Sequence, residues 1–187
     1  MRVIAGTLGG RRLKAPAGRA TRPTSDRVRE ALFSMLGDLE GASVLDLFAG
    51  SGALGIEALS RGAGRAVFVE RDPRAAGTLR ANLESLQLGP ERAELRRGEA
   101  LAALRTARER GEHYDLVLID PPYADAAGLG EKLPALLAPL LGPGARVVTE
   151  TDRRTPLWLG LPVETERRYG DTSITIHRNP CPAQHAP

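Results

Sequence analysis

From residue 43 onward, short apolar runs alternate with longer amphipathic segments. This alternation predicts βαβ units arranged around a mainly parallel sheet. The expected strands span residues 44–48, 66–70, 93–97, 115–119 and 145–150. The expected helices span residues 53–61, 73–87, 99–110 and 127–141. The pattern therefore indicates an α/β, Rossmann-like fold.

The pattern changes near the C-terminus. Residues 163–169 and 172–178, joined through Gly170 and Asp171, predict an antiparallel hairpin that closes the sheet. Residues 179–187 contain three prolines and are expected to be a disordered tail.

The N-terminal part predicts an extension to this core. Residues 2–5 and 12–13 resemble two short strands around Gly9 and Gly10, a hairpin too brief to be stable without a surface to dock on. A helix is expected to begin after residues 24–26, whose Thr, Ser and Asp side chains can cap it. Its apolar positions at helical spacing are Val28, Ala31, Leu32, Met35 and Leu36.

The length of 187 residues fits a single domain with its own core. We expect an extension at 1–40, a core at 43–178 and the tail at 179–187. The single cysteine, Cys181, excludes an internal disulfide framework and a Cys-rich zinc site. No run approaches the roughly 20 apolar residues of a membrane helix. We expect a cytoplasmic protein that is monomeric and binds neither membrane nor metal.

Charge is distributed unevenly along the chain. The net charge is +3, yet residues 1–30 carry +6, which leaves −3 for the remainder. The basic residues of this segment are Arg2, Arg11, Arg12, Lys14, Arg19, Arg22, Arg27 and Arg29. A GC-rich genome would explain the preference for Arg over Lys, but not the clustering. A basic segment on a slightly acidic body is typical of contact with a phosphate backbone.

A glycine-rich turn follows the first expected strand. Asp46 ends that strand, and Gly50, Gly52 and Gly55 lead into the next helix, where absent Cβ atoms would let a ligand approach the backbone. The glycine spacing also satisfies the dinucleotide fingerprint of NAD enzymes. However, a pyrophosphate gains nothing from the carboxylate of Asp46, whereas the cationic methionyl part of S-adenosylmethionine does. The turn therefore favours S-adenosylmethionine.

Two further strand ends add candidates for the same ligand. Glu70 ends the second strand, where a carboxylate can accept hydrogen bonds from both ribose hydroxyls, as it also does in NAD enzymes. Arg71 and Asp72 either border the adenine or form a solvated pair. Glu99, after the third strand, is placed either to contact the adenine amino group or to act as a carboxylate favoured by the helix dipole.

A second motif, Asp120-Pro121-Pro122-Tyr123, follows the apolar run at 116–119. The Asp120 carboxylate and the Pro121 carbonyl could accept both N–H groups of an exocyclic amine and direct its lone pair at a methyl donor. Tyr123 would stack on the nucleic-acid base that carries this amine, once that base is unpaired. Taken alone, the motif is as compatible with a stiff loop as with a catalytic turn; beside the glycine turn and Glu70, catalysis is favoured.

The chain as a whole, apart from the tail, resembles the RsmD-type 16S rRNA guanine-N2 methyltransferases. The resemblance rests on residues 2–11, 22–24, 27–33, 46–52, 120–123 and 169–172 and on Asn82. It implies the class I methyltransferase fold with a seven-stranded sheet, S-adenosylmethionine as donor, and one guanine of small-subunit RNA as acceptor. Because so small a chain has little surface for recognising RNA sequence, we expect the guanine to be presented within an assembling 30S particle. It further implies that Thr24, Arg27 and Glu30 face cofactor and base.

The candidate residues fall into three groups. The catalytic candidates are Asp120, Pro121 and Tyr123. The cofactor-binding candidates are Asp46, Phe48, Gly50, Ser51, Gly52, Glu70, Arg71, Glu99, Ala100 and Thr24. The RNA-binding candidates are Arg2, Arg11, Arg12, Lys14, Arg22 and Arg27.

Other functions share parts of this pattern. The Pro-Pro-aromatic turn also serves methyltransferases of DNA adenine N6 and of glutamine amides, and the glycine turn with Glu70 also suits an NAD-dependent oxidoreductase. A non-catalytic RNA-binding assembly factor could keep the same fold. Of the remaining residues, Trp158 is expected to be a packing residue rather than a base-stacking one, and Asn82 a helix-to-loop hydrogen bonder that supports the catalytic turn. His113, His177 and His185 show no ligand spacing.

Overall fold

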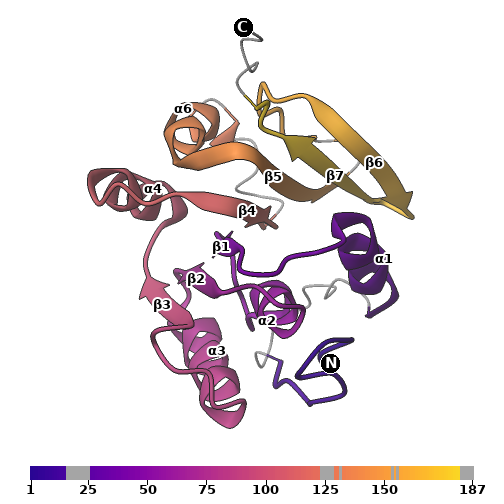
Figure 1. Cartoon of the computed structure of the whole chain (residues 1–187), viewed down its shortest axis with the longest axis vertical. Helices are drawn as coiled ribbons and strands as arrows, with labels where there is room; N and C mark the ends of the chain where they lie inside the picture. The colour runs from indigo at the N-terminus through magenta and orange to yellow at the C-terminus, as the bar shows by residue number, and fades with distance from the viewer. Residues whose placement is uncertain (16–25, 123–128, 131, 153, 155, 182–187) are drawn as a thin grey trace, which may run out of the picture.

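A computed structural model describes residues 1–15, 26–122, 129–130, 132–152, 154 and 156–181. Within them a seven-stranded sheet runs in the order β3-β2-β1-β4-β5-β7-β6 (Figure 1). The strands are β1 (Ser43–Asp46), β2 (Arg65–Glu70), β3 (Ala93–Arg97), β4 (Tyr114–Ile119), β5 (Leu141–Asp152), β6 (Val163–Tyr169) and β7 (Thr172–Arg178). β1 to β5 are parallel, and β7 lies antiparallel between β5 and β6. The expected Rossmann-like fold and closing hairpin are confirmed.

The described helices cover both faces of the sheet (Figure 1). α1 (Asp26–Leu36), α2 (Ala53–Ser60) and α3 (Pro73–Ser85) pack on the face that carries Val44, Phe68 and Leu118. α4 (Ala100–Glu109), α6 (Leu133–Leu137) and the 3₁₀ turn η1 (Ala138–Leu140) pack on the face that carries Leu45, Val67 and Val117. No helix in the described part of the chain is both long and apolar enough to cross a bilayer.

One helix boundary differs from the sequence prediction. The expected helix at 127–141 lies partly outside the described residues, and its described remainder is the short α6 followed by η1. Pro139 has no N–H to continue an α-helix, so the chain tightens into a 3₁₀ turn there. β5 then begins at Leu141, earlier than the expected residue 145.

The N-terminal arm, residues 1–14, docks on α2. Its strands are reduced to one antiparallel bridge, between Arg2 and Arg12. The N–H groups of Ile4 and Ala5 donate to the fully buried Glu57 carboxylate over 2.7 and 3.1 Å. Ser60 accepts the Leu8 N–H through its hydroxyl, and its carbonyl accepts the Thr7 N–H. The prediction that the hairpin needs a docking surface is confirmed.

The buried face of α1 corrects the sequence prediction in two ways. Arg29, Leu32, Phe33 and Leu36 are buried, whereas Val28 is only partly so. Arg29 donates to the Arg2 carbonyl and, over 3.1 Å, to Asp26, and its Nε lies 3.8 Å from Glu57. Arg29 therefore joins the arm to α1 and α2, and it does not belong to the surface charge that could meet a phosphate backbone.

Trp158 was expected to be a packing residue rather than a base-stacking one, and the packing role is wrong. Its side chain is 77% exposed, whereas Leu157 and Leu159 are buried against the α6 face of the sheet. Because consecutive side chains of an extended segment point to opposite sides, burying the two leucines turns Trp158 outward.

We predict that Gly6→Ala detaches the arm from α2. Gly6 has φ +81°, and an added Cβ would overlap the Ser60 carbonyl oxygen. We expect a loss of about 1–3 kcal/mol in the free energy of unfolding and faster amide exchange throughout the arm.

Gly10→Ala is the matched control, because Gly10 also has φ +81° but has no atom within 4 Å of the added Cβ. Gly10→Ala should lower the free energy of unfolding only by the cost of a left-handed backbone at a residue with a side chain. The amides of the arm should stay protected from exchange. Equal exchange in the two variants would contradict the docking described here.

Candidate active site

The carboxyl ends of three neighbouring parallel strands bring the candidate carboxylates to one edge of the sheet. Asp46 ends β1, Glu70 ends β2, and Asp120 follows β4. Asp46 pairs in register with Phe68 of β2 and Leu118 of β4. The edge at which these strands end is where ligands bind in open α/β sheets.

The glycine turn, residues 47–52, connects β1 to α2 and is shaped by two of these carboxylates. The Gly50 N–H donates to Glu70 Oε2 over 2.8 Å, and the Gly55 N–H donates to Asp46 Oδ2 over 3.1 Å. The other oxygen of Glu70 accepts the Asp72 N–H over 2.7 Å. Glu70 thus holds the turn at Gly50, and Asp46 holds the first turn of α2 that follows it.

The three glycines serve different needs, which corrects the sequence interpretation. A Cβ on Gly52 would overlap Leu79, and one on Gly55 would enter the Phe68 ring, so these two glycines permit packing within the protein. Gly50, with φ +55°, has only the Phe48 carbonyl oxygen near its added Cβ, at 4.0 Å. Of the three, only Gly50 borders open space where a ligand can approach.

Asp46 is a buried carboxylate with unusual electrostatics. Burial and the neighbouring Glu70 raise the pKa of Asp46 to about 7, although N–H donation from Gly55 and Phe48 opposes the rise. Among the described residues no cationic side chain pairs with Asp46. A buried carboxylate without a protein cation beside an open turn suits a positively charged ligand.

Asp120 shares this environment, and Glu150 is a residue that the sequence analysis missed. Burial raises the pKa of Asp120 well above its ordinary value, and the charges of Glu150 and Asp46 raise it further. Ile119 is in register with Thr149 of β5, so Asp120, directly after β4, lies beside Glu150, which is still within β5. Glu150 ends the expected strand at 145–150, so the strand-end rule that identified Asp46 and Glu70 would also have identified it.

The other cofactor candidates border the same edge with different exposure. Ser51 is buried, and its hydroxyl lies 3.7 Å from the Met1 sulfur. Phe48 is partly buried against the α4 face, and Ala100 is buried at the start of α4. Arg71 and Glu99 form an exposed ion pair at 3.6 Å. Glu99 is the N-cap residue of α4 and makes no side-chain capping hydrogen bond, a position that fits a carboxylate favoured by the helix dipole.

Asn82 supports the glycine turn rather than the catalytic turn, contrary to the sequence prediction. Its side chain is 1% exposed and donates to the Ser51 carbonyl over 2.9 Å. It also exchanges two hydrogen bonds with the Lys14 backbone. The sequence marked Asn82 as a helix-to-loop hydrogen bonder but could not identify the loop.

The described RNA-binding candidates lie on or beside the arm. Arg2 and Arg12 face each other across the bridge and line a cavity of about 450 Å³ with Met1, Leu13 and Asp26. Arg2 pairs with Asp26 at 3.8 Å, Arg11 donates to the Ser85 carbonyl, and Lys14 and Arg27 are exposed. Pro121 is buried behind Asp120. Thr24, Arg22 and Tyr123 lie outside the described residues.

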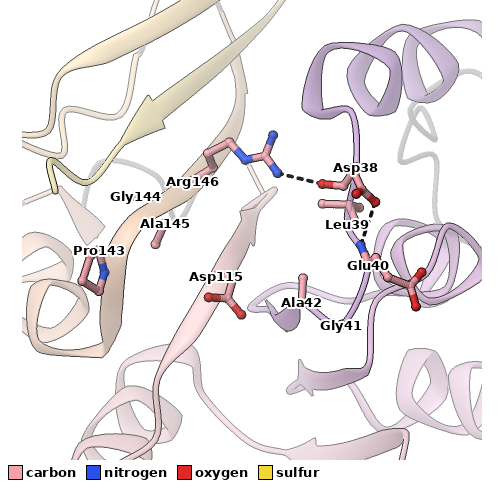
Figure 2. Close-up of a pocket in the computed structure, with 10 residues that line it drawn as sticks. All are labelled: Asp38, Leu39, Glu40, Gly41, Ala42, Asp115, Pro143, Gly144, Ala145 and Arg146. Carbon is pink, nitrogen blue, oxygen red and sulfur yellow. Dashed lines mark hydrogen bonds between the residues drawn. The ribbon is translucent and has the colours of Figure 1, made fainter.

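A second cavity, of about 370 Å³, lies at the opposite, amino ends of β1, β4 and β5 (Figure 2). Asp38, Glu40 and Asp115 line it with Arg146, which donates to the Leu36 and Asp38 carbonyls. Asp115 accepts the Ser43 N–H over 2.9 Å. These side chains are occupied in tying β1, β4 and β5 to the segment after α1, and the cavity is remote from the carboxyl edge.

The fold and these motifs recur in known proteins. The family model described as "Conserved hypothetical protein 95" matches residues 1–178. The chain is 42% identical to the putative rRNA methyltransferase YlbH of Bacillus subtilis, over 95% of this chain and 98% of the relative. It is 39% identical to ribosomal RNA small subunit methyltransferase D of Haemophilus influenzae, over 96% and 94%.

Solved structures agree. The putative methyltransferase yhhF from Escherichia coli superposes with a TM-score of 0.82 at 33% identity, covering 97% of this chain and 99% of that one. A more distant RNA methyltransferase from Salinibacter ruber, solved with S-adenosyl-L-homocysteine, shares the fold with a TM-score of 0.64 at 19% identity, covering 88% and 97%. The resemblance inferred from the sequence is therefore confirmed: this chain belongs to the Conserved hypothetical protein 95 family, the family of the RsmD-type methyltransferases.

Proposed function

We propose that this chain transfers a methyl group from S-adenosylmethionine to the exocyclic N2 amine of a guanine in 16S ribosomal RNA, within an assembling small subunit. The observation that carries the proposal is the placement of Asp120 and Pro121 beside the glycine turn at the carboxyl edge of the sheet. The names of the relatives, which include an rRNA small subunit methyltransferase, support the reaction class and the kind of substrate.

The glycine turn suits this cofactor better than a dinucleotide. The buried Asp46, which forms no ion pair with a cationic side chain of the described residues, would hold the cationic methionyl part. Both oxygens of Glu70 accept backbone N–H groups and keep acceptor capacity for ribose hydroxyls. Gly50 provides the open approach to the backbone. When bound, S-adenosylmethionine supplies a methyl group already activated by the sulfonium.

Asp120 and Pro121 would prepare the acceptor. The lone pair of an exocyclic amine is delocalised into the purine, so it must be localised before it can attack. Hydrogen bonds from the amine to the Asp120 carboxylate and the Pro121 carbonyl would favour a pyramidal nitrogen. The raised pKa of Asp120 makes this carboxylate a suitable acceptor for the proton that the amine must release. Stacking of the base on Tyr123 stays a prediction.

The arm would contact the RNA backbone. Like charges directly across a strand pair are unfavourable, so Arg2 opposite Arg12 calls for a compensating anion. The Asp26 carboxylate lies 3.8 Å from the Arg2 guanidinium, and both side chains are exposed, so this ion pair compensates the charge of Arg2 only weakly. Phosphate groups flanking the target base would supply the remaining negative charge.

The test is methyl transfer from labelled S-adenosylmethionine to under-methylated small subunits, to naked 16S rRNA and to DNA, followed by digestion to nucleosides and mass identification. We expect N2-methylguanosine, with subunits as the better substrate. N6-methyladenine in the DNA digest would overturn the acceptor, and the absence of transfer to any nucleic acid would direct attention to glutamine amides or to an oxidoreductase.

Asp120→Ala should lower methyl transfer by about a hundredfold or more, because the amine loses the acceptor that orients it. Binding of S-adenosylhomocysteine should stay within about twofold of the unsubstituted protein, a change worth no more than about 0.4 kcal/mol. Single-turnover transfer and isothermal titration calorimetry measure the two effects.

Asp115→Ala is the matched control, since Asp115 lies on the same strand at its amino end. It removes one hydrogen bond to Ser43 and should leave transfer nearly unchanged per folded molecule. If Asp120→Ala weakened cofactor binding as much as it slowed transfer, the role assigned to Asp120 would be wrong.

Cofactor affinity should rise with pH. With the pKa of Asp46 at about 7, its ionised fraction grows from about a tenth at pH 6 to about nine tenths at pH 8. Since only the carboxylate attracts the cationic amino group of S-adenosylhomocysteine, we expect binding to tighten several-fold over this interval. Asp46→Asn, which can still accept the Gly55 N–H, should bind weakly and with a flat profile. An unchanged pH profile in this variant would contradict the assignment.

A further inference from the structure

Asn82 of α3 is the only residue in the described chain whose side chain bonds both the arm and the glycine turn. Its Oδ1 accepts the Lys14 N–H over 2.8 Å, and its Nδ2 donates to the Lys14 carbonyl over 3.1 Å. The same Nδ2 donates to the Ser51 carbonyl over 2.9 Å. The carboxamide thus imitates a strand partner for Lys14 while reaching the turn with its second hydrogen.

The rigidity of this group links the two segments. A primary amide is planar, so its two N–H directions are fixed relative to each other. Asn82 is 1% exposed, and water cannot easily replace either bond. A shift of the Ser51 carbonyl therefore changes the geometry offered to Lys14, and a shift of Lys14 changes the geometry offered to Ser51.

The arm meets the same turn residue at a second point. The Ser51 hydroxyl lies 3.7 Å from the Met1 sulfur, and the Met1 sulfur also lies 3.7 Å from an Arg29 nitrogen. The Ser51 carbonyl and hydroxyl are therefore both directed to the arm, one through Asn82 and one through Met1. Two further anchors of the arm, Glu57 and Ser60, lie in the body of α2, beyond the turn.

We propose that Asn82 is a positioning residue that couples the glycine turn to the N-terminal arm, so that binding of cofactor and binding of RNA strengthen each other. The proposal rests on the function proposed above, in which the turn holds S-adenosylmethionine and the arm meets RNA. A ligand that fixes Ser51 also fixes Lys14 and the basic residues beside it. Because coupling between binding sites is reciprocal, RNA on the arm favours the cofactor to the same degree.

The test is the Kd of an RNA fragment carrying the target loop, measured with and without saturating S-adenosylhomocysteine. We expect the ligand to tighten RNA binding about fivefold or more in the unsubstituted protein, within the usual range of coupling between sites. In Asn82→Ala the ratio should fall below about twofold. A merely structural side chain would weaken both Kd values and leave their ratio intact, which would overturn the proposal.

Ser60→Ala is the matched control. It also removes hydrogen bonds to the arm, namely those with Leu8 and the Ala5 carbonyl, but Ser60 does not contact the turn. This variant should weaken RNA binding with and without S-adenosylhomocysteine and keep the full ratio. Loss of coupling in Ser60→Ala would show that any loosening of the arm suffices and would refute the specific role of Asn82.

Amide hydrogen exchange tests the coupling without RNA and without turnover. S-adenosylhomocysteine should slow exchange of the Lys14 and Leu13 amides in the unsubstituted protein and not in Asn82→Gln, whose longer side chain displaces the carboxamide. An arm whose exchange is unaffected by S-adenosylhomocysteine in the unsubstituted protein would overturn the proposal even if Asn82→Ala failed to fold. Absence of methyl transfer to RNA would instead count against the proposed function, because this readout depends only on the turn and the arm.

Discussion

The glycine turn and the start of α2 that follows it are held by contacts from four separate parts of the chain. Glu70 of β2 holds the Gly50 N–H, Asp46 of β1 holds the Gly55 N–H, and Asn82 of α3 holds the Ser51 carbonyl. The N-terminus completes the set through Met1. Since these contacts come from different elements, the shape of the turn depends on the whole fold, and a distortion in any of these elements reaches it.

The same edge concentrates negative charge at a cost to stability. Asp46, Asp120 and Glu150 lie at the carboxyl edge of three adjacent strands. Burial raises the pKa of Asp46 and of Asp120, and nearby carboxylates raise both further, Glu70 that of Asp46, and Glu150 with Asp46 that of Asp120. Such an arrangement is unfavourable until a cation or a proton is supplied. A cationic cofactor and an amine that releases a proton provide both, so we interpret the unfavourable electrostatics as part of the function.

The sequence predicted what depends on local pattern and missed what depends on tertiary partners. Alternating apolar runs located the strands, and polar residues at their ends located Asp46, Glu70 and Asp120 at a common edge. The burial of Arg29 could not be predicted, because it depends on Glu57 from a distant helix and on the arm. The predictions for Trp158 and Asn82 failed for the same reason. The sequence pattern does not say which distant groups a side chain will contact in the folded protein.

The most direct test of the account is calorimetric titration of the protein with S-adenosylhomocysteine and, in parallel, with NADH. The geometry of Asp46 and Glu70 around Gly50 predicts saturable binding of S-adenosylhomocysteine and no detectable binding of NADH. Saturable binding of NADH with no heat from S-adenosylhomocysteine would contradict the account, because the turn would then hold a pyrophosphate beside the carboxylate of Asp46.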